Sequence, residues 1–443
     1  MKRKLYKNEC TSFHDEMIKE ITEAPTNKSK FAFHNNIIKY SKLIFSDDLD
    51  KQIESLSFFC STLRNYEIEI DSAVFLRIVD ICNFKNNLTY IKGLETIKLL
   101  LSFNSKMLNK EIKNKVVDLA LSDFPTKLTF GILINLALYD TDAQFLICKK
   151  GILNNVIEMI SNGSEFLLEC VNLANNLVYQ IQDTDFITRE FEDAFINIMD
   201  LLIILLQNTS DEKLHAMIFY YFLNSISGNK LGVHFINNNI LNIMINIKIL
   251  NNEMIEIIIN VAKEIVDNFE NGPDYILSND FLSWVEQYFD NISLVESIFT
   301  FLAHLNYTVK DISDFFVRKS YHKYALQYFN DSNFKFSLRK AAMELLIEMI
   351  TNSSTESFEI LIHDDCYNIL FENTDFITGN EEYYFVKAIG RIIELNDRKE
   401  YEYLFDMMRT NENFVEWLKN LEFSNDRELS NLVWLISNFL FYK

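Results

Sequence analysis

Glycine and proline are scarce in this 443-residue sequence, which holds only 9 Gly and 3 Pro. At average usage a chain of this length would hold about 31 Gly and about 22 Pro. β-rich folds and doubly wound α/β folds use these residues in their many turns and phosphate-binding loops. The sequence therefore argues against both classes and predicts an almost entirely helical protein.

Basic charge is also in short supply. The chain carries 42 Lys+Arg against 63 Asp+Glu, a formal net charge of −21. Binding to nucleic acid or to an anionic membrane surface needs clustered Lys and Arg, so neither is expected. No apolar stretch approaches the roughly 20 residues that span a bilayer, which predicts no membrane insertion. The acidic balance fits either a basic partner or a well-solvated surface.

Motifs for catalysis, phosphate binding and metal binding are missing as well. The sequence contains no G-x-x-x-x-G-K-[ST], G-x-G-x-x-G, H-E-x-x-H or G-x-S-x-G pattern, and its carboxylate pairs, such as Glu253 with Glu256, lie in polar sequence typical of a solvated helix face. The sequence thus predicts a protein that is not an enzyme and needs neither a cofactor nor a metal ion.

Cysteine usage and the amino terminus point to one cellular setting. The six cysteines are scattered and form no C-x-x-C pair, which favours reduced core thiols over a disulfide framework. The first residues lead into polar sequence without the apolar segment of a secretory signal. These features predict a soluble cytoplasmic and nuclear protein.

What the sequence does contain is a recurring helical pattern. Strongly apolar segments with i, i+3, i+4, i+7 spacing recur, and equivalent positions late in successive segments are 35 to 48 residues apart. This period is close to that of armadillo and HEAT repeats, in which stacked helical units bury one another's apolar faces. The predicted fold is all-α, a right-handed superhelical solenoid of about ten such repeats over residues 45–443. Residues 1–44 would form a partly disordered head with an entry helix near Phe31–Phe45. Two unrelated helical domains are the alternative, although no Pro/Gly linker separates them. The segments are Ile53–Leu63, Leu94–Phe103, Leu128–Leu138, Phe166–Val178, Leu214–Ile226, Met254–Val266, Leu294–Leu305, Leu338–Ile350, Tyr384–Leu395 and Leu429–Leu440.

One stretch is more specific than the period. Residues 131–161 contain Gly131, Asn135 and Gly151 in this order. In importin-alpha, the nuclear import adaptor, one armadillo repeat ends with a W-x-x-x-N motif and the next begins with a glycine followed by a helix. This stretch resembles that family, with Gly131 at the Trp position. Similar pieces follow at residues 172–177, 220–228 and 434–438.

The resemblance implies a binding mode. A row of Asn side chains, one per repeat, would hydrogen-bond the backbone of an extended peptide whatever its sequence, because each carboxamide both donates and accepts. Aromatic rings would hold the stems of Lys and Arg, and carboxylates their head groups. The implied cargo is a basic peptide of the nuclear-localisation type, and the implied further partner is importin-beta or an exportin. The implied peptide-binding residues are Asn135, Asn176, Asn224, Tyr220, Asp140 and Asn172.

The sequence also departs from the family. At the Trp positions only Tyr220 and Trp434 are aromatic, and at the Asn positions the later repeats carry Glu264, His304 and Glu348 instead. The alternative function is therefore an armadillo or HEAT scaffold, or a chaperone cofactor, that binds a folded protein partner.

Overall fold

Helices are the only regular secondary structure among the described residues of the protein. The computed structural model describes residues 27–66, 68, 70–82, 87–104, 108–181, 185–226, 230–309, 311–367, 371, 374–377, 380–394 and 402–442. No β-strand occurs among them, which confirms the all-α prediction. The chain divides into two compact units, residues 1–150 and residues 151–443. Most of the predicted head, residues 1–26, falls outside the described residues.

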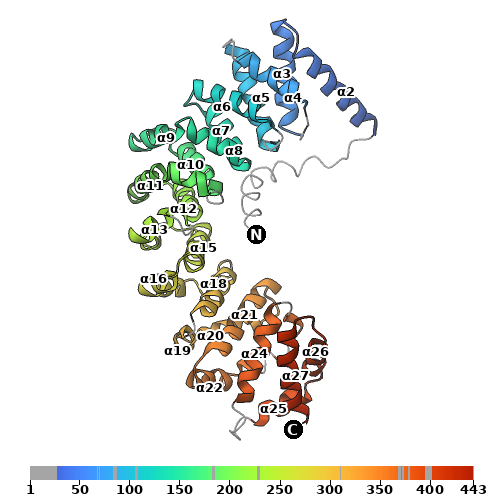
Figure 1. The fold of residues 1–443 in the computed structure, drawn as a ribbon, viewed down its shortest axis with the longest axis vertical. Coiled ribbons are helices and arrows are strands. Elements are labelled where there is room, and N and C mark those ends of the chain that lie inside the picture. Colours follow the sequence, from blue (N-terminus) through green and yellow to red (C-terminus); the bar gives the residue numbers. More distant parts are fainter. Residues whose placement is uncertain are drawn as a thin grey trace. The chain divides into compact units, whose positions relative to one another are not determined.

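The first unit consists of seven described helices. Helices α3, α5 and α7 contact one another in chain order, α4 and α6 pack against α5 and α7 respectively, and α2 packs on α3 (Figure 1). The bounds are α2 (Asn27–Leu43), α3 (Leu49–Leu63), α4 (Ser72–Cys82), α5 (Asn87–Asn104), α6 (Lys110–Ser122), α7 (Lys127–Tyr139) and α8 (Thr141–Lys149).

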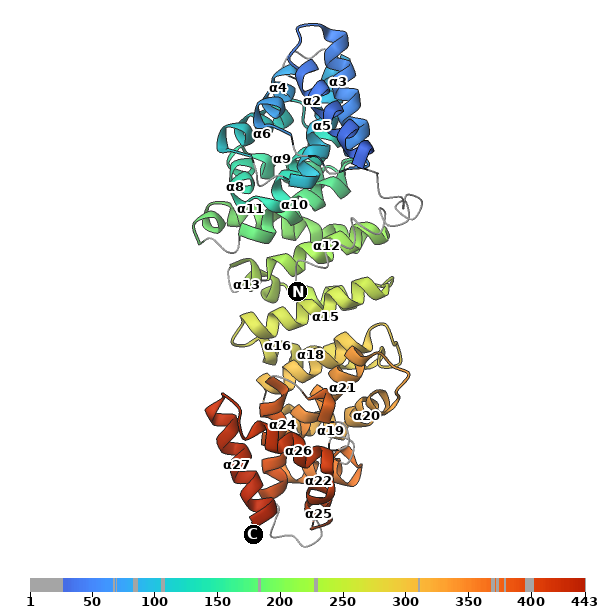
Figure 2. The same cartoon turned by 90° about the vertical axis from the view of Figure 1, so that its right-hand side faces the viewer.

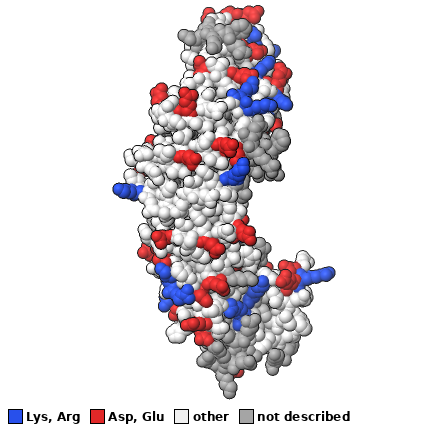
Figure 3. All heavy atoms as spheres, turned by 60° about the vertical axis from the view of Figure 1, so that its left-hand side comes forward, with Lys and Arg blue, Asp and Glu red and all other residues white. Residues whose placement is uncertain are grey.

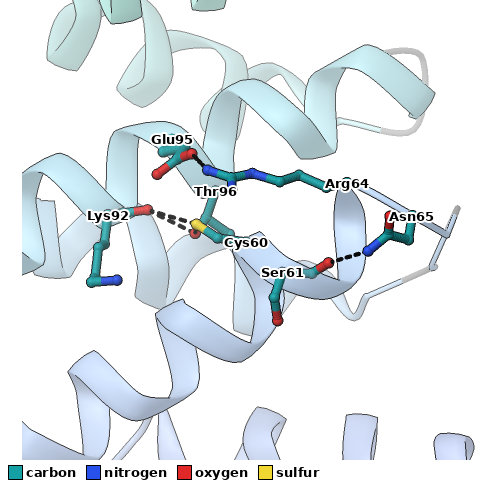
Figure 4. A network of polar contacts seen from close by, with 7 residues as sticks. All are labelled: Cys60, Ser61, Arg64, Asn65, Lys92, Glu95 and Thr96. Atoms are coloured by element: carbon teal, nitrogen blue, oxygen red, sulfur yellow. Dashed lines mark hydrogen bonds and ion pairs between the residues drawn. The ribbon is translucent and has the colours of Figure 1, made fainter. Parts of the chain in front are cut away.

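Polar side chains tie α3 to α5 within an otherwise apolar interface (Figure 4). The Sγ atom of Cys60 lies 3.0 Å from Oγ1 of Thr96, and Arg64 pairs with Glu95 one turn further along α3. Burial raises the pKa of the Cys60 thiol, so the sulfur stays protonated at neutral pH. Cys60 is one of five described cysteines, all buried and free, as expected for core thiols.

The second unit is built on seven long helices that contact one another in chain order, here called the row helices: α10, α12, α15, α18, α21, α24 and α27. Figure 2 shows α12, α15 and α18 lying one after another along the long axis. In Figure 1, α11, α13, α16 and α19 lie along one side of the row helices. The bounds are α9 (Ile152–Ser161), α10 (Leu167–Ile181), α11 (Asp185–Asn208), α12 (Glu212–Ser225), α13 (Lys230–Asn237), α14 (Ile240–Ile245), α15 (Asn252–Asn268), α16 (Gly272–Ser278), α17 (Phe281–Glu286), α18 (Val295–Thr308), α19 (Ile312–Arg318), α20 (Tyr321–Asn330), α21 (Phe336–Asn352), α22 (Thr355–His363), η2 (Thr374–Phe376), α24 (Asn380–Glu394), α25 (Glu402–Thr410), α26 (Glu412–Leu421) and α27 (Arg427–Tyr442).

The apolar segments predicted from periodicity form α3, α5 and α7 of the first unit and the seven row helices of the second. Several of these helices begin after an Asp or Asn residue, which are residue types that cap helix starts. At the start of α12, the side chain of Asp211 accepts hydrogen bonds from the backbone amides of Lys213 and Leu214. At the start of α15, the side chain of Asn251 accepts a hydrogen bond from the backbone amide of Met254. Because such caps satisfy amides that lack an intrahelical partner, they fix where each row helix begins.

Large apolar side chains fill the interior of the second unit. Phe299 and Phe301 of α18 are fully buried, as is Phe281 of α17, whose ring meets that of Phe301 edge to face. In the described part of the chain, no helix is long and apolar enough to cross a membrane. On the side that carries α11, α13 and α16, Figure 3 shows acidic side chains in small groups separated by neutral surface, with Lys and Arg interspersed.

Candidate peptide-binding face

An acidic stripe runs over three neighbouring row helices. On α15, residues spaced three or four apart turn their side chains away from the apolar interior, and α18 and α21 repeat the pattern. We call this surface the row face. Its members are Glu253, Glu256, Asn260 and Glu264 of α15, Glu296, Thr300, His304 and Tyr307 of α18, and Lys340 and Glu344 of α21.

Neutral hydroxyl groups hold the carboxylates of the row face in place. Each bond joins one row helix to the next, so the carboxylates are positioned by the packing of the stack itself. The hydroxyl of Tyr220 donates to Glu253 Oε1 at 3.2 Å, Ser297 donates to Glu256 Oε1 at 3.4 Å, and Ser337 donates to Glu296 Oε2 at 2.8 Å.

In the described part of the chain, none of these three side chains forms an ion pair. Among the described residues, no Lys, Arg or His nitrogen lies within ion-pair distance of Glu253, Glu256 or Glu296. Like charges fixed on one surface produce a negative potential that attracts cationic groups. The row face therefore offers three fixed carboxylates to a positively charged partner.

One end of the row face contains a buried carboxyl group beside two tyrosine rings. Glu348 of α21 is only 9% exposed and accepts a hydrogen bond of 3.0 Å from Nδ2 of Asn352. Burial is the main cause that raises its pKa to about 7, with the nearby charge of Glu344 adding to the effect and that of Lys387 opposing it. The rings of Tyr307 and Tyr384 meet edge to face nearby, 5.6 Å between centroids.

Two of the predicted peptide-binding amides lie inside the helix packing. Asn176 of α10 is 4% exposed and Asn224 of α12 is 8% exposed. The Nδ2 group of Asn224 donates to Oδ1 of the fully buried Asn175 at 2.6 Å. This bond joins α10 to α12, so at least one donor of Asn224 is committed to the fold. The peptide-binding role of both amides stays a prediction.

The remaining candidates in the second unit are Asn172 and Tyr220. Asn172 of α10 is half-buried, while Tyr220 of α12 is largely buried and reaches the row face through its hydroxyl group. Tyr220 thereby acts on Glu253, a contact that the sequence alone did not indicate.

In the first unit, the side chain of a lysine lies where the resemblance places an aromatic slot. A Cβ atom on Gly131 would overlap the Cδ and Cε atoms of Lys98 from α5. The carbonyl oxygen of Lys98 accepts a 2.9 Å hydrogen bond from Nδ2 of Asn135. Both motif residues of α7 thus contact α5, and Asn135 keeps only part of its hydrogen-bonding capacity for a peptide.

Asp140, the predicted Lys-binding carboxylate, is engaged inside the protein. Its Oδ1 atom caps α8 by accepting a 3.0 Å hydrogen bond from the backbone amide of Ala143. Its Oδ2 atom forms an ion pair with Lys113 Nζ at 2.6 Å. Both side chains of this pair are buried, with 10% of Lys113 and 6% of Asp140 exposed. An internal cation therefore already occupies the position that the resemblance assigns to cargo.

The comparisons with known proteins supply no family for this chain. No family model matches it, and no curated protein matches its sequence. Function is therefore inferred from the residues themselves.

The buried bond between Asn175 and Asn224 gives a stability prediction. We expect Asn224→Ala to cost about 1–3 kcal/mol, because Oδ1 of the buried Asn175 loses a hydrogen-bond donor. In a double-mutant cycle with Asn175→Ala, the coupling energy should be at least about 0.5 kcal/mol. Urea unfolding followed by circular dichroism measures both values.

Asn154→Ala, at an exposed position of α9, is the matched control and should change stability by less than about 0.5 kcal/mol. A coupling energy near zero would show that the two amides act independently.

Proposed function

We propose that this protein is a helical-repeat adaptor that holds an extended, positively charged segment of a partner protein along the row face. The observation that carries the proposal is the set of Glu253, Glu256 and Glu296, whose side chains are bonded, among the residues that the structure describes, only to neutral hydroxyl groups. In the wider form of the proposal, the helices belong to an armadillo- or HEAT-like solenoid of about ten repeats.

The spacing of the row helices favours an extended segment. Packed helices lie about 8–10 Å apart, and an extended chain advances about 3.3 Å per residue. A Lys or Arg at every third position would therefore bring one cation to each successive helix. A compact cluster of basic residues would meet the carboxylates of one helix only.

The resemblance to importin-alpha suggests the biological setting. In that setting the segment would be a nuclear localisation signal, the protein would move between cytoplasm and nucleus, and importin-beta or an exportin would be a second partner. The carboxylates of the row face support the basic character of the cargo better than the buried amides do. Nuclear import is thus the specific form of the adaptor function that we propose.

The test compares two triple variants that change the net charge equally. Glu253→Gln, Glu256→Gln and Glu296→Gln together should weaken binding of a labelled peptide with lysine at every third position about tenfold, since exposed ion pairs contribute about 0.2–1 kcal/mol each. The control is Glu356→Gln, Glu412→Gln and Glu416→Gln, at exposed positions of α22 and α26, which should leave affinity nearly unchanged. Fluorescence anisotropy measures both. Equal losses in the two variants would indicate a non-specific effect of net charge and would refute the row face as the binding surface.

Exposed aliphatic residues favour a second candidate, an adaptor for a folded partner. Ile249 and Ile292, each three residues before the start of a row helix, are exposed at the ends of α15 and α18. Apolar side chains at equivalent places of consecutive units would suit a partner with an apolar surface. Weakened partner binding after Ile249→Ser and Ile292→Ser, with peptide affinity unchanged, would favour this candidate.

A further inference from the structure

We propose that Tyr307, Tyr384 and Glu348 form a corner that takes one basic side chain of the bound segment, and that Glu348 releases its proton to solvent when this cation arrives. The proposal rests on the proposed function and adds a docking point and a pH dependence to it. The three residues come from three consecutive row helices, α18, α24 and α21.

The aromatic part of the corner is open to a cation. Tyr307 lies near the end of α18 and is 57% exposed, while Tyr384 lies near the start of α24 and is half-buried. The interplanar angle of 81° directs the edge of one ring at the face of the other. Cations are attracted to the faces of tyrosine rings within about 6 Å of the centroid. Helix α24 already contains such a cation–π contact, since Lys387 Nζ lies 4.4 Å from the ring centroid of Tyr383, the residue next to Tyr384.

The carboxyl group of Glu348 lacks a cation of its own. Its hydrogen bond comes from the neutral Asn352, and among the described residues no Lys, Arg or His nitrogen is within ion-pair distance. Burial raises its pKa to about 7, so the neutral form dominates below neutral pH. Burial is the main cause that raises the pKa of Tyr384 to about 12, and the hydrogen bond with Tyr307 and the nearby charge of Glu348 add to it. These effects place the hydroxyl end of Tyr384 close to both residues.

Groups on the neighbouring helices do not fill the role of the missing cation. On α24, Lys387 acts on Glu348 only from a distance, and Arg391 donates to the carbonyl oxygen of Thr351 at 2.9 Å. On α18, His304 Nε2 lies 2.6 Å from the Asp267 carboxylate of α15. On α21 itself, Glu344 adds a second negative charge. A cation from a partner would therefore be the nearest positive charge to Glu348.

The expected pH dependence follows from linkage. A bound cation stabilises the carboxylate form and lowers the pKa of Glu348, so binding below about pH 7 must expel a proton. The expelled proton opposes binding at low pH, and affinity should rise about tenfold between about pH 6 and about pH 8. Lys and Arg of the peptide keep their charge over this range, so they contribute no pH dependence.

The test uses the full chain and the labelled peptide with lysine at every third position. For the wild type we expect the tenfold tighter binding at about pH 8, and calorimetry in buffers of different ionisation enthalpy should report release of nearly one proton at about pH 6. Glu348→Gln should bind with the weaker affinity at both pH values and release no proton. Tyr307→Ala, at an exposed position, should weaken binding about threefold to tenfold at about pH 8. His304→Gln should keep the wild-type pH dependence, because the titrating group is Glu348.

Two outcomes overturn the proposal and are distinguishable. If the peptide binds but Glu348→Gln retains the pH dependence and the proton release, the corner is wrong while the proposed function stands. If the wild type binds no cationic peptide at either pH, both fail. The proton count on the wild-type protein needs no substitution, so a variant that folds poorly does not decide the result.

Discussion

Replacing Lys113 by methionine should lower the free energy of unfolding by about 3–5 kcal/mol, because it leaves the buried carboxyl group of Asp140 without its cationic partner. The two side chains lie 2.6 Å apart and are almost completely covered. Urea or thermal unfolding of the purified variant measures the change.

Two further variants separate the buried charge from the lost side chain. Adding Asp140→Asn to Lys113→Met should restore most of the stability, since asparagine is neutral and still caps α8. Lys115→Met removes a lysine of the same helix from an exposed pair with Glu111 and should cost less than about 1 kcal/mol. A loss for Lys113→Met as small as that for Lys115→Met would mean that the Asp140 site admits water.

The second large effect is expected at Gly272, the first residue of α16. A Cβ atom here would overlap the carbonyl oxygen of Ile265. The same oxygen accepts a hydrogen bond from the backbone amide of Phe269 at the end of α15. Because the obstacle is backbone, Gly272→Ala must displace α16 from α15. We expect a loss of about 3 kcal/mol, at the upper end of the usual cost of overpacking.

The matched control for this glycine lies in α24. A Cβ atom on Gly390 meets no atom within 4 Å beyond its own helix, so Gly390→Ala should stabilise the protein by about 0.5–1 kcal/mol through its higher helix propensity. Thermal unfolding of both variants measures the contrast. If both substitutions shift the midpoint in the same direction, the close approach of α15 and α16 is not what requires a glycine at position 272.

The helices themselves could be predicted from the sequence. Scarce Gly and Pro together with the 3.6-residue apolar period predicted helices such as α15 and α18, because each long helix buries one apolar side. Asn251, whose side chain caps α15, is of a residue type that favours helix starts.

The environment of single polar residues could not be predicted in this way. Periodicity places Asn224 on a helix, but it does not say that the neighbouring row helix covers that side and supplies Asn175, 49 residues away. The partners of Asp140 and Glu256 are likewise distant in sequence: Lys113 on α6 and Ser297 on α18. From the sequence alone, Glu253 and Glu256 resemble a solvated helix face, and the hydroxyl groups that bond them come from other helices. The recurrence of a Glu near the start of consecutive row helices, as at Glu253 and Glu296, is the signal that could have indicated the row face.

The most direct test of the row face is to locate a bound cationic peptide on the protein. A peptide with lysine at every third position and a photo-reactive group between two lysines would be cross-linked to the full chain, and the modified residues identified by mass spectrometry. We expect the cross-links to fall on residues 253–264 of α15 and 296–307 of α18, and to disappear when excess unlabelled cationic peptide is present. Cross-links concentrated on α11, α13 or α16, or equal labelling by a neutral peptide of the same length, would contradict binding at the row face.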